Sequence, residues 1–521
     1  MARFNTAAPA RPRGPVRSET VASGTTFEGA PGYAREAKSE LFLGAVTNLM
    51  EDSFYESASE RSSRLRGLIE QVAVADGDWT MRFVRWLRTE ANLRSVSVFV
   101  AVEAVRARLA AGAVGENRGI IRAAIARADE PSEVIAYATS IFGRSLPKAV
   151  KRGVADAVAD VYTERSWLKW RGKGKAGSVS FRDVLNLVHP TPKNARQAEL
   201  FEQIIADGYG RKTELGESLL VLRARDEFAA LSVDERRARI TAPGAVEELA
   251  KSGITWEALA GFVGKLTSAE WEAVIPSMGY TALRMNLRNF VEAGVSDSVL
   301  DEVAKRLADP EEVRKSGTMP VAFLSAYRNA PLRFHYPLEQ ALNHSIANIP
   351  ALPGRTLVLV DESGSMGASL SERGTLTRMD AAAVFGAALA LRGENVTLVG
   401  FESRSRVVKF TKSDSVLPLA NKFSTRGGTN TQAAIREHYD GHDRVIVLTD
   451  EQAYGGWGYY GKDVFDGVVP EKVHAFTWNL AGYERGHAAE SKTRTTFGGL
   501  SDIGFQLIEP IESGRFVENL F

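Results

Sequence analysis

Apolar residues recur at helical spacing through the first two-thirds of the chain. From about residue 39 to residue 349 they fall mostly at positions i, i+3, i+4 and i+7, as in helices that bury one face. Short turns containing Gly, Pro, Asp or Asn separate these segments, and β-branched runs with a period of two are rare. The pattern therefore predicts many antiparallel helices joined by short links, an arrangement typical of α-helical repeats.

The pattern changes at the segment 348–355, whose two prolines and one glycine predict a linker. Beyond it, short continuous apolar runs alternate with helical segments, which indicates a parallel sheet covered by helices on both faces. We therefore predict a disordered or extended N-terminal arm rich in Pro, Gly, Ala and Arg, a helical module and one open α/β domain. The predicted ranges of these parts are 1–38, 39–349 and 355–521.

The composition of the 521 residues, 44% hydrophobic and 25% charged, is ordinary for a globular protein. The chain has no cysteine, which excludes disulfides, zinc–thiolate sites and cysteine nucleophiles. It has no run of eighteen apolar residues, and its N-terminal stretch lacks the apolar region of a signal peptide. We therefore expect no membrane association and a cytoplasmic location.

Positive charge is concentrated in one window, residues 144–196, although the net charge of the whole chain is only +1. The window contains twelve Lys or Arg residues and four Asp or Glu residues, and within it Trp167 and Trp170 alternate with Lys169 and Arg171. Flexible cations suit phosphate contacts, and aromatic planes suit stacking on unpaired bases. The alternative is a solvated charged face with both tryptophans in the core.

Oxygen-bearing side chains follow the first buried strand of the α/β part and recur at two later strand or helix ends. The apolar run "LVLV" continues into Asp361-x-Ser363-x-Ser365, Thr429 lies in "RGGTNT", and Asp450 ends the strand "RVIVL". Ligands of open α/β sheets lie beyond the carboxyl ends of the strands. Two carboxylates with three hydroxyls form a hard oxygen set, which suits Mg²⁺, Mn²⁺ or Ca²⁺. The alternative for the first motif alone is a polar turn.

These three motifs together resemble the metal-ion-dependent adhesion site (MIDAS) of von Willebrand factor A domains, whose pattern is Asp-x-Ser-x-Ser, a distant Thr and a distant Asp. The resemblance implies that Ser363, Ser365 and Thr429 touch a divalent cation directly. It implies that the two aspartates act directly or through water, and that an acceptor from a partner completes the shell. Asn430 stands where many relatives have an acid.

The segments "GRSLPKAVKRGVADAVADVY", "KWRGK" and "SFRDVLNLVHPTP" resemble the signature region of the TROVE module of Ro-family RNA-binding proteins. The segments "MRFVRWLRTEANLRSVSVFVAVEA", "YTALRMNLRNFVEAGV" and "MPVAFLSAYRNA" are similar as well, and so is the order of a helical module followed by an A domain. The resemblance implies a monomeric ring of HEAT-like helical repeats with a basic central hole, completed by the Rossmann-like von Willebrand factor A domain.

The Ro resemblance also implies a function. A small noncoding Y RNA would bind the outer surface, and single-stranded 3′ ends of misfolded RNAs would enter the hole, in RNA quality control with a tethered exoribonuclease. Lys169, Arg171 and His189 match positions associated with Y RNA binding, and the longer "GKGKAGSVS" loop leaves open whether Lys173 or Lys175 contacts RNA. The candidate RNA-binding residues are Arg144, Lys148, Lys169, Arg171, Lys173, Lys175, Arg182, His189, Arg284 and Arg288.

Arginines on other helices could line such a hole in pairs three or four residues apart. They are Arg82, Arg85, Arg88 and Arg94 early in the chain, with Arg284 and Arg288 later. The alternative is that they form intramolecular ion pairs, with acids such as Glu90 and Glu292. No GxSxG, Walker or HExxH motif is present, so we expect no catalytic activity. The alternative function is a metal-dependent protein-interaction scaffold that binds no RNA.

Overall fold

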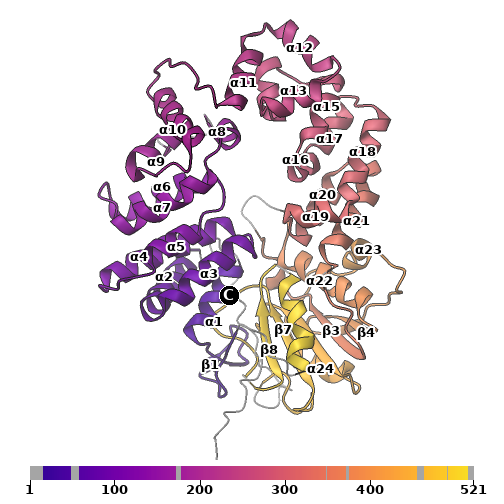
Figure 1. Ribbon diagram of the computed structural model, residues 1–521. Helices are drawn as coiled ribbons and strands as arrows, with labels where there is room; N and C mark the ends of the chain where they lie inside the picture. Colours follow the sequence, from indigo (N-terminus) through magenta and orange to yellow (C-terminus); the bar gives the residue numbers. More distant parts are fainter. Residues whose placement is uncertain are drawn as a thin grey trace, which may run out of the picture. The chain divides into compact units, whose positions relative to one another are not determined.

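The computed structural model describes residues 16–47, 58–171, 178–347, 349–370, 375–454, 463–489, 491–500 and 502–513. Contacts divide the chain into two compact units, each described here by itself (Figure 1). The first unit comprises Met1–Leu68, Gly317–Asn329 and Leu338–Leu520, and the second comprises Ile69–Ser316 and Ala330–Pro337. This grouping differs from the three ranges expected from the sequence, because the N-terminal segment and α20 (Pro320–Asn329) belong with the sheet.

The second unit is helical throughout its described residues, as the periodicity predicted. Neighbouring helices pack on one another along the chain, α3 on α5, α5 on α7, α7 on α9 and α9 on α10. Its elements are α3 (Gly77–Thr89), α4 (Arg94–Ala110), α5 (Asn117–Ala123), α6 (Glu130–Phe142), α7 (Lys148–Val161), α8 (Glu164–Trp170), α9 (Phe181–Val188), α10 (Ala195–Gly208), α11 (Leu220–Ala230), α12 (Val233–Thr241), α13 (Ala245–Lys251), α14 (Trp256–Val263), α15 (Ser268–Val274), η1 (Ile275–Ser277), α16 (Tyr280–Met285), α17 (Leu287–Glu292), α18 (Asp297–Ala308), α19 (Pro310–Ser316) and η2 (Leu332–Phe334). Helix α2 (Ala58–Ala75) crosses the boundary between the units.

One segment predicted as a single helix, "YTALRMNLRNFVEAG", is instead two short helices that meet at Asn286. The buried Asn286 side chain donates to the Ala282 carbonyl at 2.8 Å and accepts from Asn289 at 2.8 Å. Its own backbone N–H turns to the Leu283 carbonyl, at 3.2 Å. Because the side-chain amide takes the acceptor that a continuing helix would use, α16 ends there and α17 begins.

The first unit contains a six-stranded sheet in the order β5-β4-β3-β6-β7-β8, parallel except for the antiparallel pair β4–β5. The pattern of alternating strands and helices is thereby confirmed, although β8 was not predicted. The strands are β3 (Arg355–Asp361), β4 (Asn395–Phe401), β5 (Ser405–Val407), β6 (Arg444–Thr449), β7 (His474–Asn479) and β8 (Arg494–Gly498). Helices and 3-10 turns of this unit are α1 (Ala37–Val46), α20, η3 (Gly364–Gly367), α22 (Arg378–Arg392), α23 (Val416–Ala420), α24 (Thr431–His438), η4 (Asp502–Leu507) and α25 (Ile508–Glu512). Helix α21 (His335–Ser345) begins in the second unit and continues in the first.

Helices cover both faces of this sheet. Successive residues of β3 point to opposite sides, so alternate residues contact different helices. Leu357 and Leu359 pack in one apolar cluster with Ile435 of α24. On the other face, a Cβ on Gly386 of α22 would lie 2.5 Å from Val360, so only glycine allows the helix to approach this closely. The helical region and the mostly parallel α/β sheet are thus confirmed, whereas the ring and the HEAT-like repeat stay predictions.

The described part of the predicted N-terminal arm, residues 16–38, packs within the first unit, and residues 1–15 of that arm lie outside the described residues. Its short strands β1 (Gly24–Thr25) and β2 (Pro31–Gly32) pair with each other. Tyr33 is 1% exposed and exchanges two backbone hydrogen bonds with Gly486, at 3.0 and 3.2 Å. Before α1 this segment therefore contains short strands, and Tyr33 is part of the core. None of the helices in the described part of the chain is long and apolar enough to cross a membrane.

Candidate functional site

The oxygen-bearing motifs meet at the carboxyl edge of the sheet. Strands β3 and β6 are parallel neighbours, and they end at Asp361 and Thr449, so Asp361 and Asp450 emerge at the same edge. The Thr449 hydroxyl donates to one oxygen of Asp361 at 2.5 Å, and the backbone N–H of Ser363 donates to the other at 2.9 Å. The hydroxyls of Ser363 and Ser365 lie 3.1 Å apart.

The loop that contains Thr429 lies against the first motif. The Gly364 N–H donates to the Gly427 carbonyl at 2.9 Å, and the Arg426 N–H donates to the Glu362 carbonyl at 2.6 Å. Thr429 itself is buried, at 4% exposure. Backbone hydrogen bonds thus hold the "RGGTNT" loop beside the Asp361–Ser365 turn.

The electrostatics of this cluster favour a cation. Burial and the neighbouring charge of Asp450 raise the pKa of Asp361 to about 7. Burial also raises the pKa of Asp450, against the opposing hydrogen bond to Ser365 and the charge of Arg378. The Oδ2 atom of Asp450 is buried and accepts no hydrogen bond from the described residues. Two buried carboxylates, one with an unsatisfied oxygen, fit a divalent cation that the hydroxyls would help to hold.

Asn430 has a structural explanation. Its side chain caps α24 by accepting from the Ala433 N–H at 3.2 Å. Asparagine is a preferred N-cap residue, so the departure from the family pattern keeps the helix start. No group of three or more His, Asp or Glu side chains within the described ranges is placed to hold a metal in another way.

Sequence reasoning missed the buried charges that support the site. Glu451 has a left-handed backbone, with φ of 62°, and its carboxylate accepts from Arg35 and Asn479. Glu362 is 1% exposed and accepts from Arg406 at 2.7 Å and from the Ser424 N–H at 2.9 Å. These acids sit beside the predicted ligands in the sequence, but no motif shows that their partners lie far along the chain.

Five of the candidate RNA contacts are exposed on or beside α7, α8 and α9, and we call them the α7–α9 surface. Capping boxes start α8 at Thr163 and α9 at Ser180, and Tyr162 stacks on Phe181 with ring centroids 4.2 Å apart. The three helices therefore form a firm support. The exposed members are Arg144, Lys148, Lys169, Arg171 and His189.

His189 ends α9 in a left-handed conformation, with φ of 48°, so its ring stands at a turn and outside the regular helix. Arg182 is engaged within the protein, since its guanidinium donates to Asp183 at 3.1 and 2.7 Å and lies 4.9 Å from the ring of Tyr209. Lys173 and Lys175 lie outside the described residues.

The exposure of the two tryptophans of the basic window differs from what the base-stacking hypothesis predicted. Trp167 is 4% exposed and belongs to the core, so for this residue the alternative interpretation is correct. Trp170 is half-buried, with the guanidinium of Arg127 5.2 Å and the ammonium of Lys169 5.5 Å from the centre of its ring. The ring of Trp170 is therefore already in contact with two cations of the protein.

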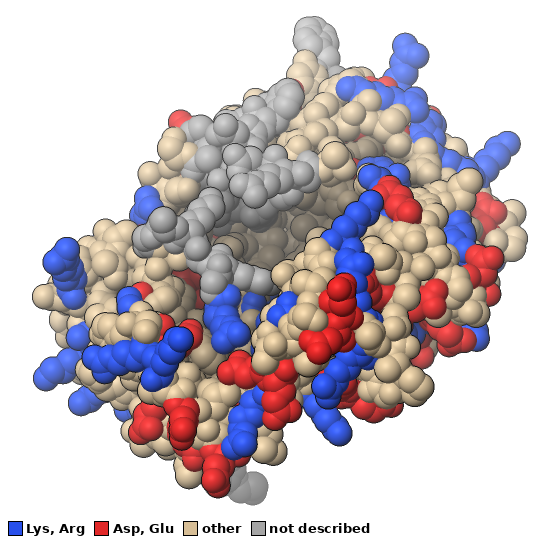
Figure 2. All heavy atoms as spheres, turned by 90° about the horizontal axis from the view of Figure 1, so that it is seen from above, with Lys and Arg blue, Asp and Glu red and all other residues tan. Residues whose placement is uncertain are grey.

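The four acids of the basic window are all held in ion pairs. Asp156 pairs with Arg118 at 2.6 Å, Asp160 pairs with Arg122 and Lys193, and Arg196 donates to Glu164 at 2.9 Å. Asp183 pairs with Arg182, as described above. Figure 2 shows basic and acidic side chains intermixed over the face that it draws. Phosphate contacts of the basic window would come from individual exposed cations.

Three of the six arginines proposed to line a hole form ion pairs. Arg82 pairs with Asp78 at 3.1 Å, and the buried Arg88 pairs with Glu130 at 2.8 Å. Arg94 contacts three acids, Asp129 at 2.7 Å, Glu130 at 3.3 Å and Glu133. The alternative interpretation therefore holds for these three arginines, although with other acids than Glu90.

The remaining members of that set differ in exposure. Arg85 and Arg288 are exposed, whereas Arg284 is only partly exposed, and burial lowers its pKa. Arg284 lies on α16 and Arg288 on α17, so the two do not share one helix face as predicted, and Arg288 is the more exposed of the two.

Comparison with known proteins gives one family match and one described structural match. Residues 248–335 match the family model described as the TROVE domain, a stretch that includes two of the segments on which the resemblance rested. No curated protein matches the chain. The crystal structure of the Deinococcus radiodurans RO (RSR) protein matches with a TM-score of 0.62 and 19% identity, over 92% of this chain and 100% of that one. Residues 248–335 thus match the TROVE domain and the chain has a fold similar to that of a bacterial Ro protein, so the resemblance inferred from its sequence is confirmed.

Proposed function

We propose that this Ro-type protein binds RNA, and that a small structured noncoding RNA of the Y class contacts the α7–α9 surface. The TROVE domain and the Ro fold support RNA binding in general. The observation that supports this surface is that its five members are exposed on or beside packed helices, while every acid of the surrounding window is already paired.

The finer parts of the proposal rest on the Ro resemblance. Single-stranded 3′ ends of misfolded RNAs would bind a second surface of the helical unit, with Arg85 and Arg288 as its exposed cations. The protein would act in RNA quality control in the cytoplasm, as a monomeric ring and an adaptor for an exoribonuclease, without catalytic activity of its own.

The test of the α7–α9 surface is the salt dependence of RNA binding by the double variant Lys169→Ala/Arg171→Ala. Each lost phosphate contact removes about 0.9 from the slope of log K against log salt, so the slope should flatten by about two. The matched control is Lys305→Ala/Arg314→Ala, which removes the same charge from exposed lysine and arginine side chains paired with neighbouring glutamates. Equal slopes and affinities for both variants and the wild type would show that the surface is wrong.

A second RNA surface is tested with three versions of one RNA, in which the 3′ tail is single-stranded, absent or closed into a hairpin. We expect tail-dependent binding that survives the Lys169/Arg171 double variant and is lost in Arg85→Ala/Arg288→Ala. Equal affinity for all three RNAs would leave a single binding surface.

A second candidate function, metal-dependent binding of a protein partner, is favoured by the unsatisfied buried oxygen of Asp450. We propose that Asp361, Ser363, Ser365, Thr429 and Asp450 bind one divalent cation, most readily Mg²⁺. Titration calorimetry with Mg²⁺ and Mn²⁺ should give heat for the wild type and none for Asp361→Ala. The control Asp440→Ala removes a carboxylate whose side chain is 92% exposed, and it should leave the heat unchanged. Equal heats for Asp361→Ala and the wild type would contradict the site.

A further inference from the structure

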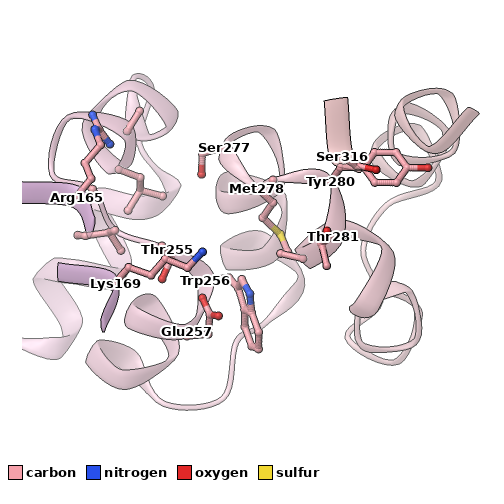
Figure 3. Close-up of a pocket in the computed structure, with 16 residues that line it drawn as sticks. Arg165, Lys169, Thr255, Trp256, Glu257, Ser277, Met278, Tyr280, Thr281 and Ser316 are labelled. Carbon is pink, nitrogen blue, oxygen red and sulfur yellow. The ribbon is translucent and has the colours of Figure 1, made fainter. Parts of the chain in front are cut away.

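A cavity of about 620 Å³ opens in the helical unit between α8 and the segments that contain α13, α14 and α16 (Figure 3). All its lining residues except Arg165 and Lys169 fall in the stretch 248–335 that matches the TROVE domain. Its volume lies within the range of small-molecule sites and exceeds what water alone would need.

The wall between α8 and α13 is held by close contacts. Gly253 has φ of +58°, and a Cβ at this position would lie 3.5 Å from Leu168 and 3.7 Å from Arg165 of α8. The buried Glu164 at the start of α8 accepts from the backbone N–H groups of Val221 and Leu222, each at 2.9 Å. The pocket is therefore built by packed elements and does not depend on a loose loop.

One side of the pocket is apolar and aromatic. Leu249, Ile254 and Met278 are buried residues that contribute to its lining. Trp256 lines it as well, and its ring stacks on Trp271 with centroids 5.7 Å apart and planes at 29°. A tryptophan held in this way is already ordered, so a flat ring can contact it without a further loss of side-chain entropy.

The other side is cationic. Arg165 and Lys169 stand four residues apart on α8, on one face of the helix, and both are exposed. In Figure 3 the Lys169 ammonium reaches toward Trp256 and the carboxylate of Glu257. A ligand of the pocket would therefore meet an aromatic ring and positive charge within one volume.

We propose that this pocket binds a single nucleotide, with the base against Trp256 and the phosphate against Lys169 and Arg165. A purely apolar ligand would form no ion pair with the two cations, and inorganic phosphate would not contact the apolar wall. A free mononucleotide and an unpaired nucleotide of an RNA share this chemistry. The second source rests on the proposed RNA-binding function, and the first does not.

The first experiment titrates adenosine 5′-monophosphate, adenosine and ribose 5-phosphate into the full chain by calorimetry. We expect saturable binding of the monophosphate, about tenfold tighter than either fragment, because base stacking and phosphate pairing each contribute. Trp256→Leu should weaken it about tenfold, and Ala250→Leu should weaken it by narrowing the pocket from an exposed helical position. Lys305→Ala, outside the pocket, should not change it.

The second experiment compares an RNA hairpin that has one unpaired adenosine with the same hairpin fully paired. If an RNA nucleotide is the natural occupant, the unpaired adenosine improves binding about tenfold, and Trp256→Leu removes that gain. If the monophosphate binds and the bulge gives no gain, the occupant is a free nucleotide and the pocket assignment stands.

Two results would overturn the assignment. One is the absence of both saturable monophosphate binding and any gain from the bulge, even if the paired hairpin still binds and the proposed function holds. The other is unchanged binding in both Trp256→Leu and Ala250→Leu. Monophosphate binding without any hairpin binding would instead support the pocket and contradict the proposed function.

Discussion

Replacing Arg35 by methionine should strongly destabilise the first unit. The Arg35 guanidinium donates to the Tyr483 carbonyl at 2.7 Å, to the Glu484 carbonyl at 3.2 Å and to the Glu451 carboxylate. The side chains of Arg35 and Glu451 are 0% and 1% exposed. Methionine fills much of the same volume but leaves a buried carboxylate without its cation.

The expected cost is about 3–5 kcal/mol of unfolding free energy, the usual range when one partner of a buried ion pair is removed. The double variant Arg35→Met/Glu451→Gln should recover part of this loss, because an amide carries no charge to leave uncompensated. The control Arg17→Met breaks the exposed pair with Glu36, whose atoms are 3.8 Å apart, and should cost about 0–1 kcal/mol.

Urea unfolding followed by near-UV circular dichroism measures these differences, since the first unit contains the buried Trp478. A loss below about 1 kcal/mol for Arg35→Met would refute the reasoning. So would a double variant whose loss equals the sum of the two single losses, because the charges would then not be coupled.

Three further predictions concern stability. Gly153→Ala should cost about 1–3 kcal/mol, because its Cβ would lie 2.7 Å from Ile121, whereas Gly261→Ala meets no atom within 4 Å and should stabilise its helix by about 0.5–1 kcal/mol; thermal unfolding distinguishes them. Burial lowers the pKa of His487 to about 4, below the 6.5 of an exposed histidine, so the unfolded chain binds the extra proton. The resulting contribution to the free energy of unfolding is fully present above pH 6.5 and is lost as the pH falls toward 4, by about 1.4 kcal/mol per pH unit. Urea titrations at several pH values should find a weaker pH dependence of the unfolding free energy in His487→Gln than in the wild type. Mg²⁺ should raise the unfolding temperature of the wild type and leave that of Asp450→Asn unchanged, and an equal rise in both would argue against metal binding at Asp450.

Local patterns predicted the elements whose determinants are local. The run "RMDAAAVFGAALALR" is the helix α22 at the same bounds, and "NVTLVGF" is β4, because each segment carries its own periodicity and end signals. The sequence also predicted that the metal-site motifs lie close together, because the carboxyl ends of parallel strands meet at one edge of the sheet. The break between α16 and α17 at Asn286 was not predicted, because it depends on the hydrogen bond from the Asn286 side chain to the Ala282 carbonyl.

Features set by distant partners could not be predicted. Nothing near Arg35 in the sequence shows that Glu451 will neutralise it, and nothing in the basic window shows that Trp167 is core while Lys169 is exposed. The pocket is a still clearer case, since its two cations and its tryptophan come from segments some ninety residues apart. Such sites follow from packing, which single-sequence patterns do not encode.

The first unit is discontinuous in sequence, and this has a consequence for how the protein is made. Arg35 leaves the ribosome 416 residues before Glu451, and at about 5–20 residues per second the delay is roughly 20–80 seconds. During that time the apolar side chains of Tyr33, Leu41 and Phe42 have no sheet to cover them, while the helical unit between can already fold. The N-terminal segment is therefore made long before the strands that it packs against, so its burial is one of the last steps of folding on the ribosome.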